Sequence, residues 1–485
     1  MTTIVLFQQN LRLADNRALS SAAAHGPVVP VYILDDNLYP SGGASRWWLR
    51  EALGDLAHNL HLHGAELILR RGATLSVLHN LIRETGATSV SWNRRYEPDA
   101  AAQDGEIQQA LEKQGIHAHI HDGFLLFDPA SIRTGGGTPF KVFTPFSKAC
   151  LNASAPPKPI PAPKKLQGVK NIASDKLDGW KLVPRAALWP KGLADAWEVS
   201  EKAAHERLAT FLDEGINAYK NDRDRPATDG TSRLSPYLHF GLISPHQIWQ
   251  AVHSTMAHSG NSASIKRYLL EILWREFSWH LLHQFPALPV KPLAASFEKF
   301  PWRDDKKALK AWQQGLTGYP IVDAGMRQLW QTGWMHNRVR MVVASFLIKH
   351  LLIDWREGEA WFWDTLVDAD LGSNAASWQW VAGCGADATP FFRIFNPMLQ
   401  GQKFDPQGQY VKHYVPELAG LPIAYIHEPW RAPPDELKKA GIKLGTTYPL
   451  PIVDHNAARK RALAALESLK NPHAAKPREK GLFDE

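Results

Sequence analysis

Short apolar runs alternate with amphipathic stretches through the first 130 residues. Mainly apolar runs predict five strands, at residues 3–7, 28–34, 66–69, 89–93 and 118–120. Between them, apolar residues recur at steps of three and four, which predicts helices most clearly at 46–62, 75–84 and 100–113. The alternation predicts an α/β domain over residues 1–130, with a doubly wound, five-stranded parallel sheet and right-handed crossovers.

The pattern changes twice after this domain. Residues 131–200 contain RTGGGTP and NASAPPKPIPAPKK, and Gly and Pro at this density do not sustain a helix or a central strand. We therefore expect a connector that crosses the surface. From about Glu201 onward the pattern is helical, as in IKRYLLEILWREFSWHLLHQF, which predicts an all-α domain over residues 201–470. A short polar tail, 471–485, follows.

Composition limits the class of protein. No run approaches the roughly 18 uninterrupted apolar residues of a membrane span. The start, MTTIVLFQQN, has neither a basic region nor a small-residue cleavage site, so it fits a first strand better than a signal peptide. Two cysteines, Cys150 and Cys384, cannot form a disulfide framework and lack the partners of a zinc site. We expect a soluble, metal-free protein of the reducing cytoplasm.

Charge and aromatic content add two expectations. A net charge of +7 and a pI near 9.1 permit a polyanionic partner, although part of the excess lies in residues 164–191 and 459–480. The chain has 19 tryptophans; many belong to the core, and the rest suggest stacking or electron transfer. No G-x-G-x-x-G motif follows the first strand, which disfavours hydride chemistry.

Residues 331–397 mix polar side chains with indoles in a way that a plain core does not need. The polar members are Asn337, Arg338, Arg340, Asp368, Asp370, Asn374 and Arg393, and the indoles are Trp334, Trp355, Trp361, Trp363, Trp378 and Trp380. Apolar spacing predicts helices on both sides of Asp368. On a helix, one face holds His336, Asn337 and Arg340, and another holds Asp370, Asn374 and Trp378. A buried Arg–Asp network that only fixes packing is the structural alternative to a binding site.

The runs QTGWMHNRVRM, LLIDWREGEAWFW, DADLGSNAASWQW and GCGADATPFFRIFNP resemble the flavin-binding domain of the photolyase/cryptochrome family. The resemblance extends along nearly the whole chain. It makes residues 1–130 an antenna domain and 201–470 an FAD-binding domain. It also implies light-driven repair of cyclobutane pyrimidine dimers, with UV-damaged DNA as the partner of a monomer.

A second run, TSRLSP, adds to the flavin site. Hydroxyls and free amides at a helix N-terminus suit phosphate oxygens, although alone such a run is usually only a cap. The resemblance assigns the FAD pyrophosphate to Thr231, Ser232, Arg233, Leu234 and Ser235, and a further flavin contact to Tyr219. Around the ring system it implies cofactor contacts by Asn337, Arg340, Asp368, Asp370 and Asn374, with Arg340 paired to Asp368 and Asn374 facing N5. An amide at 374 is what photolyases have, whereas plant cryptochromes tend to have Asp and animal ones Cys.

Three tryptophans match the family's electron relay. Trp378, Trp355 and Trp302 occupy the positions of its three-indole chain from flavin to surface. Without the resemblance, indoles so far apart in sequence are assigned to the core. Indole is readily oxidised, so near contact between such rings supports electron hopping.

Two stretches bear on a lesion site, EILWREF and residues 331–397. Glu271 and Trp274 share a helix face, and a flipped dimer needs a flat apolar platform with a hydrogen-bonding group. The resemblance implies that Trp274 and Trp380 clasp the dimer, with Glu271, Met341 and Asn374 as the catalytic set. Further DNA contacts are implied for Arg223, Asn337, Arg338, Arg393 and the lysines of residues 141–148. His336 and Asn337 stand where the (6-4) branch has adjacent histidines, which points to cyclobutane dimers.

The N-terminal domain departs from the family pattern. Gln8, Gln9 and Asn10 follow the first strand where an aromatic and charged run is usual. Residues 92–98 and 43–49 resemble those of relatives that carry methenyltetrahydrofolate, yet Asp99 and Ala100 replace the Asn-Glu of one folate-binding pattern. We expect a second chromophore, with methenyltetrahydrofolate favoured over a deazaflavin; a member with no antenna stays open.

Two rival functions stay open at this point. A cryptochrome uses the same flavin and relay to signal through a protein partner. The lack of a long C-terminal extension, together with Glu271, Asn374 and Trp380, favours the repair enzyme. An electron-transfer flavoprotein of metabolism would be indifferent to DNA.

Overall fold

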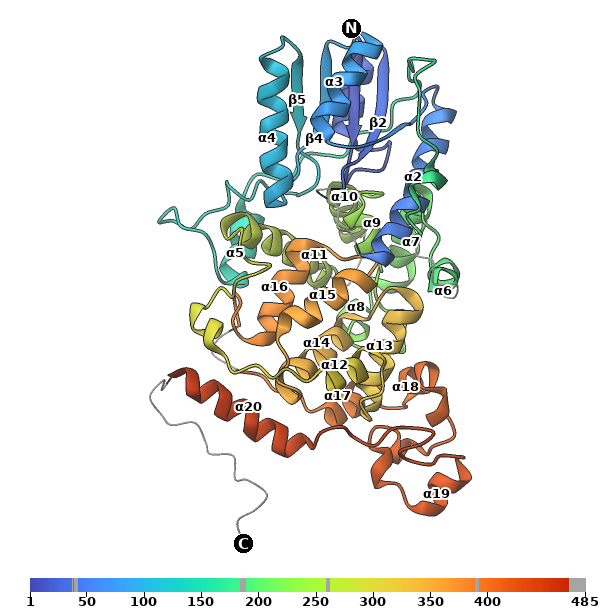
Figure 1. Cartoon of the computed structure of the whole chain (residues 1–485), viewed down its shortest axis with the longest axis vertical. Coiled ribbons are helices and arrows are strands. Elements are labelled where there is room, and N and C mark those ends of the chain that lie inside the picture. The colour runs from blue at the N-terminus through green and yellow to red at the C-terminus, as the bar shows by residue number, and fades with distance from the viewer. Residues whose placement is uncertain (37, 39–41, 184–188, 259–261, 389–391, 471–485) are drawn as a thin grey trace.

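A parallel sheet with its helices forms one end of the molecule and a helical assembly forms the other (Figure 1). This computed structural model describes residues 1–36, 38, 42–183, 189–258, 262–388 and 392–470. The predicted tail, 471–485, lies outside the described residues. No helix in the described ranges is long and apolar enough to cross a bilayer.

The predicted five-stranded parallel sheet is confirmed. Its strand order is β3-β2-β1-β4-β5, with bounds β1 Thr3–Phe7, β2 Val28–Leu34, β3 Ile68–Arg71, β4 Ser89–Asn93 and β5 His117–His121. Every residue of β1, β2 and β4 is buried, which explains why these strands appear as unbroken apolar runs. The two outer strands are less apolar, and the predicted bounds of these two differ from those found, by up to two residues.

Four helices connect the strands, and the last three of them are those that the periodicity predicts. They are α1 Arg17–His25, α2 Gly43–Leu62, α3 Thr74–Thr85 and α4 Pro98–Glu112. Local chemistry sets their ends: the side chain of Asn16 accepts a hydrogen bond from the Leu19 amide, and Gly86 ends α3 with φ of 64°.

The connector is not free of helices, so that part of the expectation is wrong. It contains α5 Phe143–Asn152, a 3₁₀ turn at Leu177–Trp180 and α6 Trp189–Ala196. The Gly and Pro residues cluster on either side of α5, whose Phe143, Phe146 and Cys150 lie on one buried face against α11. The connector also returns to the sheet domain at a bridge between Val28 and Gly168. There the Val28 amide donates to the Gln167 carbonyl at 2.8 Å, and the Val169 amide donates to the Val28 carbonyl at 3.1 Å.

The second half is helical as predicted, with no strand among its described residues. Its helices are α7 Glu201–Thr210, α8 Tyr219–Asp222, α9 Ser235–His239, α10 Pro245–His258, α11 Ser262–Gln284, α12 Lys306–Gln313, α13 Pro320–Thr332, α14 Asn337–Ser345, α15 Trp355–Thr365, α16 Leu371–Ala382, α17 Pro397–Phe404, α18 Gln409–Tyr414, α19 Pro434–Lys439 and α20 His455–Lys470. Two π-helical turns, Phe211–Gly215 and Phe346–His350, extend α7 and α14. Four 3₁₀ turns lie at Ala295–Lys299, Pro416–Leu418, Ile423–Tyr425 and Pro429–Arg431.

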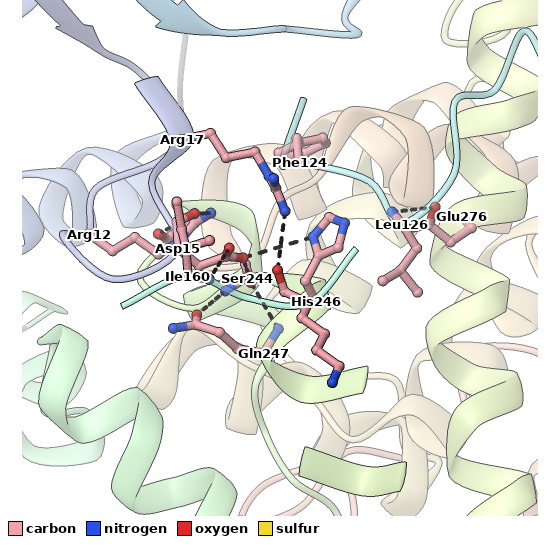
Figure 2. A network of polar contacts seen from close by, with 12 residues as sticks. Arg12, Asp15, Arg17, Phe124, Leu126, Ile160, Ser244, His246, Gln247 and Glu276 are labelled. Carbon is pink, nitrogen blue, oxygen red and sulfur yellow. Dashed lines mark hydrogen bonds and ion pairs between the residues drawn. The ribbon is translucent and has the colours of Figure 1, made fainter. Parts of the chain in front are cut away.

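A buried polar network joins the two halves behind β1 (Figure 2). Asp15 accepts from the Ser244 hydroxyl at 2.5 Å and from the Ile160 amide at 3.1 Å, while Arg12 donates to the Gly241 carbonyl at 2.9 Å. Gly241 has φ of 69°, and a Cβ there would lie 2.1 Å from the Gln9 carbonyl oxygen. Only glycine fits, so the loop before α10 sits directly against the segment that follows β1.

Candidate functional site

One cavity collects seven of the residues that the sequence singles out. It has a volume of about 190 Å³ and lies between α14, α15 and α16. Its polar or functional lining residues include Asn337, Arg340, Met341, Asp368, Asp370, Asn374 and Trp378. Apolar side chains such as Phe362 and Val381 complete the wall. A flat ring system with a few polar atoms on its edge suits such a lining.

An ion pair stands in this cavity wall. The Arg340 guanidinium donates through Nη2 to both oxygens of Asp368, at 2.8 and 3.1 Å, and through Nε to the Met335 carbonyl at 2.7 Å. The Asp368 side chain is only 2% exposed and also accepts from the Ser235 hydroxyl at 2.6 Å. Because donors from two separate helices, α14 and α9, converge on it, Asp368 fixes where the Arg340 charge sits.

Asp370 begins α16 and lies in the same wall. Its Oδ1 accepts from the Ser373 amide at 2.8 Å, and its Oδ2 accepts from the Trp279 indole at 3.1 Å. Burial alone raises the pKa of this carboxyl, but the nearby His239, whose Nδ1 lies 4.0 Å from Oδ2, and the charge of Arg275 outweigh it, so the pKa is lowered. Asp370 is therefore a fixed anion. Its neighbours Trp279 and His239 are site residues that the sequence reasoning missed.

Asn374 is oriented by the neighbouring helix. Its Nδ2 donates to the backbone carbonyl of Glu359 at 3.2 Å, and the side chain is buried. No described residue donates to its Oδ1, and the residue lines the cavity. With the amide held this way, Asn374 presents an acceptor to whatever fills the space.

The TSRLSP run borders a second, larger cavity. Thr231 and Ser232 line this space of about 530 Å³ together with Tyr237 and Arg207. Arg233 adopts φ of 49°, which turns the chain before α9 begins at Ser235. Through the bond from Ser235 to Asp368, the loop also reaches the smaller cavity. Four carboxylate residues share the larger lining, so phosphate contacts there depend on the loop itself.

Two more residues of the predicted flavin set are buried near this loop. Leu234 is 2% exposed, and Tyr219 packs edge-on against Tyr268, whose hydroxyl donates to Ser232 at 3.0 Å. The Trp334 ring lies near the guanidinium of Arg233, at 5.0 Å, and that of Arg340, at 6.0 Å. These contacts connect the loop to the Arg340–Asp368 pair in the wall of the smaller cavity.

The predicted lesion residue Glu271 is held by arginines. Its Oε1 accepts from Arg223 and lies 2.8 Å from Nη2 of Arg267. Arg223 is therefore a mostly buried partner of Glu271, with its side chain 10% exposed, and not an open surface charge. Arg267 stands one i,i+4 step before Glu271 on α11, a readable helical spacing that the sequence reasoning did not use.

A second arginine pair lies at the edge of the smaller cavity. Arg338 pairs with Asp224 at 3.0 Å and approaches the Met341 sulfur at 3.7 Å. Met341 lines the cavity itself, so this pair connects the predicted DNA-contacting residues to the predicted flavin site.

The two predicted clasp tryptophans have different neighbours. Trp274 is stacked on Phe143 of α5, with centroids 3.6 Å apart and planes at 7°. Trp380 lies under the Arg393 guanidinium at 5.2 Å. No ring contact among the described residues joins Trp274 to Trp380, so a clasp by both remains a prediction. Phe143 was missed because it falls in the connector that we expected to be irregular.

The three relay indoles are differently buried. Trp378 and Trp355 are 2% and 1% exposed, while Trp302 is half-buried. Trp378 contacts Phe362 at 5.0 Å and Trp312 at 6.3 Å, and Trp302 contacts Phe300 at 4.3 Å. Within the described ranges no ring contact links the three directly, and the relay remains a prediction.

Residues 43–49 and 92–98, the segments that resemble those of folate-carrying relatives, make many contacts within the protein itself. Trp92 is fully buried, and Arg95 pairs with the buried Asp104. Residues 43–49 begin α2, where the Gly43 amide donates to Asp364 at 2.8 Å and the Ser45 hydroxyl donates to the Leu366 carbonyl at 3.1 Å. These contacts tie α2 to the helical half.

Comparisons with known proteins agree with this geometry. Residues 3–164 match the family described as DNA photolyase, and residues 268–468 match the FAD binding domain of DNA photolyase. A deoxyribodipyrimidine photo-lyase of Agrobacterium fabrum is 52% identical, over 96% of this chain and 98% of that protein. Cryptochrome-2 of Arabidopsis thaliana is 38% identical, over 96% of this chain and 78% of that protein. The crystal structure of a bacterial class III photolyase from Agrobacterium tumefaciens superposes with a TM-score of 0.95 at 52% identity, covering 97% of this chain and 98% of that one.

Proposed function

The chain belongs to the photolyase/cryptochrome family, and from that premise we propose that it is a deoxyribodipyrimidine photo-lyase, which uses light to split cyclobutane pyrimidine dimers in DNA. One observation carries the proposal. One cavity is lined by Arg340 with Asp368, by Asn374 and by Trp378, in a helical half that matches an FAD binding domain.

FAD fits the two cavities through its two chemically different parts. The residues that hold it are the loop Thr231, Ser232, Arg233, Leu234 and Ser235 with Tyr219 near this loop, and Asn337, Arg340, Asp368, Asp370 and Asn374 around the ring. The loop supplies hydroxyls and amides for phosphates, and Arg340 supplies a positive charge for an electron-rich ring edge. Bound FAD, once reduced and excited by light, supplies the electron that splits the dimer.

The chain's own residues position the substrate. Trp274 and Trp380 provide apolar surface for the two bases, and Glu271, fixed by two arginines, accepts a hydrogen bond from a base. Met341 lines the smaller cavity, together with Arg340 and Asn374. Arg338, Arg393 and the lysines of residues 141–148 are supported as phosphate contacts by their positive charge, and Lys141 and Lys148 are exposed.

The relay and the antenna complete the proposal. Trp378, Trp355 and Trp302 serve to reduce oxidised flavin before repair, which the full burial of the first two and the partial exposure of the third support. A folate is favoured as second chromophore over a deazaflavin on the sequence of residues 92–98. Trp92, Asn93, Arg95 and Tyr96 are buried in this fold and Arg94 is exposed, so a folate there binds against the outer surface of this segment and not among its buried side chains. A near-ultraviolet absorption band separate from the flavin bands tests this assignment.

We also infer a monomer of the reducing cytoplasm. Both cysteines, Cys150 and Cys384, are free and buried, and burial raises the pKa of each thiol to about 12. Neither is thus poised for disulfide formation. Sedimentation analysis of the purified protein tests the oligomeric state.

The decisive experiment is a repair assay. Purified protein, chemically reduced and loaded with FAD, is illuminated with an oligonucleotide that contains one cyclobutane dimer, and restored pyrimidines are counted by chromatography. We expect light-dependent restoration and none in the dark. Intact dimers after illumination of a flavin-loaded, reduced sample would exclude the repair function and leave the cryptochrome reading, which the similarity to Cryptochrome-2 keeps in view.

A further inference from the structure

Residues 392–395 are held in place by two side chains of one helix. The Ser345 hydroxyl accepts from the Phe395 amide at 3.3 Å, and the Lys349 ammonium donates to the Arg393 carbonyl at 3.3 Å. Ser345 and Lys349 are four residues apart at the α14 end and in its π-helical turn, so both project from the same side. The segment itself has no regular secondary structure, and these contacts fix its course.

Lys349 is an unusual residue to find at this depth. It is 1% exposed, and its ammonium lies 3.3 Å from the centroid of the Phe392 ring. Within the described part of the chain no carboxylate forms an ion pair with it. Burial lowers the pKa of Lys349 to about 7. A buried cation without a counter-charge costs stability, so an apolar side chain would serve packing better here.

The residue that Lys349 holds belongs to the predicted lesion site. Arg393 is exposed, and its guanidinium lies 5.2 Å from the Trp380 ring. Trp380, Arg393 and Phe395 line one small cavity with Val381 and Gly383. Where Arg393 stands over Trp380 therefore depends on the course of residues 392–395.

We propose that Lys349 is a positioning residue for the DNA-lesion site, which acts by holding the Arg393 main chain so that its guanidinium lies against Trp380. The inference rests on the proposed function, because it gives Arg393 and Trp380 their roles. Lys349 itself touches neither DNA nor flavin. It acts with Ser345, and together they convert a loop into a rigid part of the binding surface.

The test uses the full-length, FAD-loaded protein with Lys349→Met, which keeps an unbranched side chain one atom shorter and removes the ammonium group. Dark binding of a dimer-containing oligonucleotide should weaken about tenfold, as for a lost charge-assisted hydrogen bond. Flavin content, flavin photoreduction and the repair yield per bound complex should stay unchanged. In kinetic terms KM rises and kcat is kept. Lys310→Met, which removes an exposed lysine on α12, controls for the loss of one positive charge.

A double-mutant cycle separates positioning from general damage. In an Arg393→Ala background, Lys349→Met should cost little further affinity, because its target is already gone. An undiminished cost in that background, or wild-type affinity in Lys349→Met alone, overturns the proposal. If Lys349→Met fails to fold, Ser345→Ala removes the other anchor and should weaken binding in the same direction, while unchanged binding in Ser345→Ala overturns the proposal.

A second measurement does not depend on repair. Amide hydrogen exchange of residues 392–395 should quicken in Lys349→Met while exchange in α11 and α13 stays the same. Unchanged exchange in the segment overturns the anchoring. If the wild-type protein binds no dimer but the segment still loosens in the variant, the proposed function fails and the anchoring by Lys349 stands.

Discussion

The Asn374 side chain donates its amide hydrogen to the backbone carbonyl of Glu359, 3.2 Å away on the preceding helix. A main-chain acceptor on α15 therefore decides which end of the Asn374 amide meets the cavity. Nitrogen is turned to the protein and oxygen to the ligand space. The side chain is thus suited to accept a hydrogen bond from a protonated ring nitrogen.

Replacing Asn374 with Asp should change which one-electron form of the flavin accumulates. The carboxylate cannot donate to the Glu359 carbonyl, so one hydrogen bond worth about 1 kcal/mol is lost and an anion faces the ring. Anaerobic photoreduction followed by absorption spectroscopy measures the effect. Asn152→Asp, at an exposed position on α5, is the control. Identical spectra for wild type and Asn374→Asp would contradict this role.

Breaking the Arg340–Asp368 pair should release the cofactor. Arg340→Leu leaves the nearly buried Asp368 carboxylate without its cation, which costs about 3–5 kcal/mol for a buried pair. We expect little FAD in the purified variant and a lower melting temperature. Arg431→Leu removes an exposed pair with Glu428 and should cost under about 1 kcal/mol. Full flavin content in Arg340→Leu would argue against this wall as the ring site.

Trp378→Phe should separate flavin photoreduction from repair. The variant loses the innermost relay indole, so photoreduction of oxidised flavin should slow by roughly an order of magnitude or more. Repair by chemically reduced enzyme should persist. Trp180→Phe, in the connector, is the matched control. If Trp378→Phe still photoreduces at the wild-type rate, Trp312, 6.3 Å from Trp378, is the next residue to replace.

Trp380→Ala should remove discrimination between damaged and intact DNA. Stacking on an aromatic side chain is worth about 1–3 kcal/mol per base, so dark affinity for a dimer should fall by about 5- to 150-fold. The residual binding should weaken steeply with salt in both proteins, because phosphate contacts remain. A binding assay with and without a dimer, at two salt concentrations, checks both parts. Equal loss for damaged and intact DNA would point to misfolding instead of lost stacking.

Stability should fall as pH rises, because of Glu359. Burial raises the pKa of this carboxyl from 4.5 to about 8. Between these values the folded protein keeps a proton that the unfolded chain has lost. The stabilising contribution is therefore complete below the lower value and is lost as pH rises to the upper one, by about 1.4 kcal/mol per unit at most. Thermal melts between about pH 5 and about pH 8 should show this slope, and Glu359→Gln should flatten it. An equal slope in the variant would contradict it.

The fold class could be predicted from local patterns because the apolar pattern of each main strand agrees with its burial in the sheet. Strands β1, β2 and β4 lie wholly in the interior, so their apolar runs gave their bounds to the residue. The outer strands β3 and β5 are partly exposed and were misplaced by up to two residues. Helix α5 was missed because its stability comes from packing on α11, which a Gly- and Pro-rich neighbourhood conceals. The domain bounds 1–130, 131–200 and 201–470 stay predictions.

For the site as for the fold, local patterns predicted one part and tertiary contacts decided the rest. Sequence alone determined the residue types, their helical spacing and the family, so the Arg340–Asp368 pair and the i,i+4 series that ends in Trp378 were expected. Only the tertiary structure decided which partners neutralise or orient them: the Glu359 carbonyl for Asn374, Arg267 for Glu271, Phe143 for Trp274 and Lys349 for Arg393. Arg267 stands at an i,i+4 step from Glu271 on the same helix, whereas the other three partners lie on other elements. Hydrogen bonds and ring stacking act over a few ångströms in space, and distance along the chain does not encode that proximity.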